Sequence, residues 1–175
     1  MAEEIFTAST ENLRDLKKQR KRICALVNRA IREKQDPDLI SLTKMYALLY
    51  SAYVETSFLK LIHTPKAFTE SEIIQIMAER NLEQKWLKCV DLAFNKLNTT
   101  NLGEVANKKQ TLHRLLQEYI IDPSQIRNKV AHGQWVYCLN NECTKVNHDT
   151  TALMANLDFV KIEKYFCICL LYTSQ

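Results

Sequence analysis

Glycine and proline are scarce in this sequence, with two glycines and three prolines among 175 residues. All-β proteins use both residue types freely in their turns, so this scarcity argues against a fold made mainly of strands and hairpins. It indicates helices that are joined by short connections. Hydrophobic residues make up 46% of the chain and charged residues 25%, which is ordinary for a globular protein. We therefore predict a single all-α domain over residues 1–175.

The sequence also lacks the marks of a secreted or membrane protein. Its first residues, MAEEIF, have no basic start followed by an apolar run, so we expect a cytoplasmic protein whose six cysteines are reduced. The most apolar stretch, residues 45–62, is short for a membrane span and is interrupted by Glu55 and Lys60. We interpret it as a central helix of the fold and expect no membrane partner.

Metal-binding patterns are sparse. No Cys-x2-Cys pair occurs, and the nearest pattern is Cys138-x4-Cys143-x4-His148, which has no obvious fourth ligand. We interpret this spacing as chance, and we predict neither a metal nor a cofactor.

Hydrophobic periodicity and capping signals predict an antiparallel bundle of four to five main helices. The predicted helices run from a cap at Ser9 or Thr10 to about Gln35, from Asp36 to Ile62, from a Thr69 capping box to about Leu97 with a break near Asn81, from about Glu104 onward, and from about Thr150 onward. The clearest predicted loop is TTNLG, residues 99–103. The aromatic run YALLYSAY, residues 46–53, is predicted to lie in the core.

Two local signals delimit a short segment late in the chain. Asp122-Pro123 reads as a cap and first-turn proline that start a new helical segment, and Gly133 ends this segment in the left-handed conformation. The following residues, QWVYCLNNECTKVN, alternate apolar and polar positions around Asn140-Asn141. We predict that residues 134–147 form a small β-hairpin.

Positive charge is concentrated in the first predicted helix. Residues 11–34 carry nine Lys or Arg against three acidic residues, a net charge of +6, whereas the whole chain has +4. Such a helix face could bind a polyanion, or it could simply be solvated. The sequence is compatible with both interpretations.

On a helical wheel, the segment from Ile126 to His132 presents two different faces. Ile126 and Val130 fall together and are predicted to face the core. Asn128 and His132, four residues apart, fall together on roughly the opposite side, and Arg127 lies between the two faces. An arginine, an asparagine and a histidine are thus expected to point away from the core near a helix end. This position suits a ligand or a second subunit.

The segment IRNKVAHG, from Ile126 to Gly133, resembles the signature of HEPN domains. These are small helical bundles with an Arg-x(4–6)-His motif, in which a polar residue often follows the arginine; Asn128 takes that place here. The resemblance implies a metal-independent endoribonuclease with a composite site at a homodimer interface. It further implies that His132 acts as general base or acid, that Arg127 stabilises the transition state and that Asn128 orients the phosphate or the histidine.

Several residues around the motif have open interpretations. Glu55 could reach the cleft and hold Arg127, or it could lie at the rim. Trp135 and Tyr137 could stack on RNA bases or pack within the hairpin. Some toxin members of the family have a modified tyrosine two residues after the histidine, but Gln134 occupies that position here.

Three functions are compatible with the sequence. The first is an RNA-cleaving homodimer that acts as a toxin or antiviral defence effector, with an antitoxin or other regulatory partner. The second is a non-catalytic HEPN-like scaffold that pairs with a nucleotidyltransferase or another partner. The third is a helical interaction domain in which the motif is accidental. The set of Arg127, Asn128 and His132 favours the first, because a scaffold has no need of these side chains on one outward face.

Overall fold

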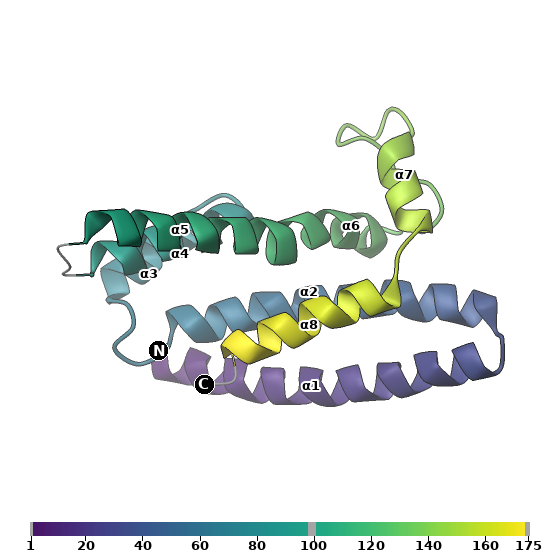
Figure 1. Cartoon of the computed structure of the whole chain (residues 1–175), viewed down its shortest axis with the longest axis horizontal. Coiled ribbons are helices and arrows are strands. Elements are labelled where there is room, and N and C mark those ends of the chain that lie inside the picture. The colour runs from purple at the N-terminus through teal and green to yellow at the C-terminus, as the bar shows by residue number, and fades with distance from the viewer. Residues whose placement is uncertain (1, 98–100, 174–175) are drawn as a thin grey trace. The chain divides into compact units, whose positions relative to one another are not determined.

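A computed structural model describes residues 2–97 and 101–173, and it confirms the prediction of an all-α protein (Figure 1). Its helices are α1 (Ala2–Arg32), α2 (Asp36–Ile62), α3 (Glu70–Met77), α4 (Leu82–Asn95), α5 (Leu102–Leu116), the π-helix η1 (Gln117–Ile121), α6 (Asp122–Ala131), α7 (His148–Ala155) and α8 (Phe159–Thr173). None of the helices in these described ranges has both the length and the apolar character that crossing a bilayer would need.

The chain divides into two compact units. The first contains residues 1–13 and 55–121, and the second contains residues 14–54 and 122–175. Both α1 and α2 therefore contribute one part to each unit, whereas α3 to η1 belong to the first unit and α6 to α8 belong to the second. The single-domain organisation of residues 1–175 stays a prediction.

The first unit follows the predicted capping signals closely. The capping box is confirmed, because Thr69 accepts a hydrogen bond from the Glu72 amide at 3.3 Å and the Glu72 carboxylate accepts from the Thr69 amide at 2.7 Å. The predicted break near Asn81 is also confirmed, since Asn81 is the N-cap of α4. In the core of this unit, the rings of Phe58 and Trp86 lie 4.9 Å apart. The predicted loop at 99–103 lies partly outside the described residues, and Asn101 caps α5.

The first helix begins earlier than the sequence predicts. Ser9 and Thr10 do not cap it, because α1 already starts at Ala2. The hydroxyl of Thr10 instead donates to the carbonyl of Phe6 at 2.8 Å, which is the bond that a threonine makes inside a helix. The capping prediction was therefore wrong at this end.

Aromatic residues of α2 and α8 form the core of the second unit, as the run at residues 46–53 predicts. Tyr46, Tyr53 and Phe166 are completely buried, and the Phe166 ring lies 5.0 Å from Tyr46 and 5.4 Å from Tyr53. Beside them, Glu163 accepts hydrogen bonds from Arg20 of α1 and from Tyr46 of α2. The Cys24 thiol also lies 3.4 Å from the Tyr46 hydroxyl. Helices α1, α2 and α8 are thus joined by packing and by a charged network.

The predicted start of a helical segment at Asp122 is confirmed, because α6 begins there, directly after η1. Proline cannot donate a backbone hydrogen bond, and its ring would clash with the carbonyl four residues earlier. The residues directly before Asp122 and Pro123 are in the π-helix η1, in which hydrogen bonds span five residues instead of four.

The predicted hairpin at 134–147 is wrong: within the described residues it is reduced to one isolated antiparallel bridge between Leu139 and Val146. Side-chain oxygens accept hydrogen bonds from backbone amides that would pair between the two strands of a hairpin. The Leu139 amide donates to Gln134 Oε1 at 2.7 Å, and the Cys138 amide donates to Thr151 Oγ1 at 2.9 Å. Alternating polarity therefore marks a loop that is held by side-chain hydrogen bonds.

The predicted last helix is split in two. Asn147 caps α7 by accepting from the Thr150 amide at 2.9 Å, and Asn156 ends it. The Asp158 carboxylate then accepts from the Val160 amide at 2.7 Å at the start of α8. Because asparagine and aspartate compete for local backbone groups, two of them within three positions interrupt an otherwise helical pattern.

Candidate active site

The motif residues lie on α6 and at its C-terminal end, in the second unit. Gly133 has φ +77°, and its amide donates to the Val130 carbonyl at 3.1 Å. The Gln134 amide donates to the Lys129 carbonyl at 2.9 Å. These two bonds form a Schellman motif, in which His132 is the last residue before the left-handed glycine. The predicted role of Gly133 as the helix end is confirmed.

Arg127 is held against α2. The side chain is half-buried, and its Nε donates to Ser51 Oγ at 2.7 Å. Ser51 is itself buried, with 5% of its surface exposed. Burial lowers the pKa of Arg127 below its usual value, but an arginine remains protonated at neutral pH. The guanidinium is therefore a positioned positive charge in the second unit.

Asn128 joins Arg127 to the outer surface of α6. Its Oδ1 accepts from Arg127 Nη1 at 3.0 Å, and its side chain is exposed. Because an arginine can only donate, the amide oxygen must face the guanidinium and the Asn128 NH₂ group must face away from it. Asn128 can therefore donate to an anionic ligand while its oxygen stays engaged.

His132 is exposed one helical turn beyond Asn128. Its backbone amide donates to the Asn128 carbonyl at 3.1 Å. Among the described residues, no hydrogen bond or ion pair holds its imidazole ring. The ring is accordingly accessible to a ligand.

On the core side of α6, Val130 is buried and Ile126 packs against it together with Cys138 and Met154. This packing fixes the rotation of α6 about its axis. It is the arrangement that the helical wheel predicts, and it leaves Asn128 and His132 on the exposed side.

Two lysines that sequence reasoning missed hold the segment after Gly133 in place. Lys44 of α2 donates to the Trp135 carbonyl at 2.6 Å, and its Nζ lies 5.7 Å from the centre of the Trp135 ring. Lys129 donates to the Leu139 carbonyl at 2.6 Å. Both lysines anchor the segment to helices of the second unit. An Arg-x4-His spacing carries no information about Lys44, because the contact joins residues 91 positions apart.

The two aromatic residues near the motif differ in their surroundings. Trp135 is half-buried, and its Nε1 donates to the Val130 carbonyl at 3.0 Å, so it packs on the end of α6. Tyr137 is 65% exposed and is available to a ligand. Gln134 uses its side chain to hold the Leu139 amide.

The remaining candidates are Glu55 and the residues of the cysteine–histidine spacing. Glu55 follows Ser51 by one turn of α2 and is half-buried, but it belongs to the first unit, and its role beside Arg127 stays a prediction. Cys138 is buried, whereas Cys143 and His148 are exposed. Within residues 2–97 and 101–173, no three His, Cys, Asp or Glu side chains are grouped as metal ligands would be.

A pocket of about 370 Å³ lies beside a different face of α6. Its walls include Pro123 and Ile126 of α6, Tyr50 of α2, and Lys161 and Tyr165 of α8. Arg127, Asn128 and His132 do not line it. The motif residues therefore lie outside this pocket.

Comparisons of the chain with known protein families, with curated proteins and with solved structures find no match. The resemblance to HEPN domains thus depends on the motif and on its surroundings within this chain.

Proposed function

We propose that this chain is a metal-independent endoribonuclease of the HEPN type, with its active site at Arg127, Asn128 and His132. The observation that carries the proposal is the arrangement at the end of α6. Arg127 is held by Ser51 at 2.7 Å and by Asn128 at 3.0 Å, while the exposed His132 lies one turn further along the same helix. A fixed positive charge, an amide donor and an accessible imidazole are therefore next to one another.

These groups suit RNA cleavage by the neighbouring 2′-hydroxyl. A base removes the proton from this hydroxyl, its oxygen attacks phosphorus, and an acid protonates the departing 5′-oxygen. The products are a 2′,3′-cyclic phosphate and a 5′-hydroxyl. Arg127 would stabilise the extra negative charge on the phosphorane-like transition state, and the NH₂ group of Asn128 would orient a phosphate oxygen. His132 would serve as the base or the acid.

The proposal includes a homodimer. One motif contains one imidazole, whereas the reaction needs both a base and an acid. Two chains around a two-fold axis would bring two copies of His132 and Arg127 into one cleft, since a two-fold interface uses the same surface of both subunits. The exposure of His132 and Asn128 supports such a composite site.

The biological role that we propose is that of a toxin or antiviral defence effector, restrained by an antitoxin or another regulatory partner. Expression of the wild-type chain should then arrest growth, and His132→Ala should relieve the arrest. Equal toxicity of the His132→Ala chain would contradict this role.

The enzymatic activity is tested by incubating the purified protein with RNA in excess EDTA and mapping the ends of the products. We expect cyclic phosphate and 5′-hydroxyl ends. We also expect His132→Ala to reduce the rate by about 100-fold or more, as is typical when a general acid or base is lost. Arg127→Ala should cause a loss of similar size.

The matched control is His148→Ala, because His148 is another exposed histidine of the second unit. This variant should cleave at the wild-type rate. Cleavage that requires a metal, or that persists in both motif variants, would refute the proposal. The non-catalytic scaffold would then be the better hypothesis.

A further inference from the structure

One face of α1 carries a regular row of basic side chains. Five of them recur at intervals that keep them within about 80° of one another on the helix, over a length of about 27 Å. We call this row the basic stripe, and it consists of Arg14, Lys18, Lys21, Arg29 and Arg32. All five residues lie in the second unit.

The basic stripe is exposed along its whole length. The opposite side of α1 faces the core, where Val27 is fully buried and Ala30 is 3% exposed. Between Arg14 and Arg32 the one acidic residue is Asp15, which lies about 100° around the helix from Arg14. The stripe is therefore a solvent-facing and mainly positive surface, with the carboxylates of Glu11 and Glu33 near its two ends.

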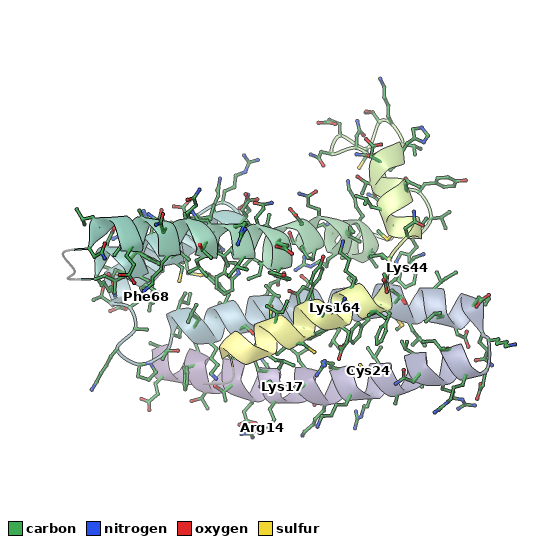
Figure 2. The ribbon with its side chains drawn as sticks, in the orientation of Figure 1. Arg14, Lys17, Cys24, Lys44, Phe68 and Lys164 are labelled. Atoms are coloured by element: carbon green, nitrogen blue, oxygen red, sulfur yellow. The ribbon has the colours of Figure 1, made fainter. Side chains whose placement is uncertain are left out.

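Two of the five side chains, Arg14 and Arg29, interact with other groups of the chain. Arg29 Nε lies 2.8 Å from Glu33 Oε1, but both side chains are largely exposed, and such surface pairs contribute little free energy. Arg20 is different, because it lies on another face of α1 and binds Glu163. The positive charge of α1 is thus divided between a structural arginine and a row of surface side chains. Figure 2 shows Arg14 projecting outward from α1.

We propose that the basic stripe binds the phosphate backbone of single-stranded RNA and holds the substrate outside the cleavage site. This inference rests on the proposed ribonuclease function and adds a second contact surface to it. Binding through phosphates depends on charge and not on base sequence. The stripe suits binding that does not depend on base sequence, because it contains no aromatic ring that could stack on a base. Ala25 and Asn28 lie between its basic residues.

Other partners fit the stripe less well. A helix that binds a membrane surface buries its apolar face in the lipid, but Val27 and Ala30 of α1 are packed in the core, and the exposed Leu26 and Ile31 lie outside the arc of the stripe. Protein interfaces are enriched in aromatic residues at their centre, and the stripe has none. A straight row of charges without an apolar anchor is best matched by a polyanion with repeating charges.

The stripe and the motif belong to different helices that both contact α2. On α1, Cys24 lies 3.4 Å from the hydroxyl of Tyr46, and on α6, Arg127 donates to Ser51. A substrate that reached both surfaces would be longer than the few nucleotides around the cleaved bond. Long RNA should therefore bind more tightly than a dinucleotide.

The experiment compares two triple variants in a His132→Ala background, so that binding is measured without cleavage. The first carries Lys18→Gln, Lys21→Gln and Arg32→Gln in the stripe. The control carries Arg80→Gln, Lys108→Gln and Arg114→Gln, which are exposed residues of the first unit and remove the same charge. Fluorescence anisotropy with a labelled, mixed-sequence single-stranded RNA gives Kd as a function of salt, and a thermal melt checks folding.

We expect the stripe variant to lower the slope of log K against log salt by about 2, since each contact with a single strand contributes about 0.7. The same relation predicts a loss of affinity of roughly 100-fold at about 0.1 M salt. The control variant should keep the parent slope. Equal losses in both variants, or no loss in the stripe variant, would overturn the proposal.

A parallel measurement uses vesicles of acidic phospholipid. Loss of vesicle binding together with unchanged RNA binding in the stripe variant would also overturn the proposal, in favour of a lipid surface. The cleavage assay is read separately. If the stripe binds RNA but the protein does not cleave RNA, the proposed ribonuclease function is wrong. The proposal that the basic stripe binds RNA would still hold.

Discussion

At the scale of single residues, the contact between Arg127 and Ser51 is the least expected feature of the site. The two residues are 76 positions apart, and the bond joins α6 to α2. A buried serine that accepts from a guanidinium fixes the direction of the charge as well as its position. Ser51 is a positioning residue in our proposal, because it acts through Arg127 and does not touch the substrate.

We predict that Ser51→Ala lowers kcat for RNA cleavage by about tenfold while KM stays close to wild type, because an interaction that acts in the transition state affects kcat. Ser51→Thr, which keeps the hydroxyl, should restore most of the rate. Steady-state kinetics on a fluorogenic RNA measures both values.

Ser57→Ala is the matched control, since Ser57 is another buried serine of α2 but belongs to the first unit. It should leave kcat unchanged. If Ser51→Ala and Ser57→Ala lowered kcat equally, or if Ser51→Thr failed to recover the rate, Ser51 would have only a structural role.

At the scale of elements, the end of α6 positions His132. The helix stops in a Schellman motif that requires the left-handed conformation at Gly133, where φ is +77°. A Cβ at this position would meet no atom within 4 Å, so an added side chain has space but a strained backbone.

We predict that Gly133→Ala lowers the free energy of unfolding by about 1 to 2 kcal/mol, because the left-handed conformation is costly for residues with a Cβ. Gly133→Asn should cost less, since asparagine visits this conformation more readily. Urea denaturation of the three proteins measures the difference. An alanine variant as stable as the wild type, or an asparagine variant less stable than alanine, would show that the helix end does not depend on this conformation.

The continuity of α5, η1 and α6 is also a property of elements. An Asp-Pro pair is a signal for the start of a helix, and α6 does begin at Asp122. The preceding residues are nevertheless helical too, since they form η1. A local sequence signal of this kind locates a boundary but does not say whether the chain turns there.

At the scale of the whole molecule, the proposed activity depends on a second copy of the chain. Each chain would supply one His132, and a mixed dimer of wild-type and His132→Ala chains would contain only one functional imidazole in the shared cleft. The composite site can therefore be tested by subunit mixing.

We predict that adding His132→Ala protein to a fixed amount of wild-type protein lowers the activity per wild-type chain, approaching a loss of about 100-fold at large excess. Cleavage rates at a series of mixing ratios measure the effect. Adding His148→Ala protein should not inhibit. Activity per wild-type chain that is independent of added His132→Ala would indicate that each chain acts alone.

Much of this protein follows from its sequence by itself. The helical class, the capping box at Thr69, the cap at Asn81, the buried tyrosines of α2 and the end of α6 at Gly133 all depend on neighbouring residues. The rotation of α6 about its axis is of the same kind, because the periodicity of Ile126 and Val130 already selects its buried side. Local geometry and side-chain polarity are sufficient for these features.

Only the tertiary structure decided the rest. It gave Arg127 a partner in Ser51, replaced the predicted hairpin with a loop held by Gln134 and Thr151, and divided the chain into two units that share α1 and α2. The first two depend on which side chain reaches a given hydrogen-bonding group in the folded chain, and the third depends on which segments pack together. Spacing along the sequence does not contain that information, because a buried donor or acceptor is satisfied by whatever group the packing brings close to it.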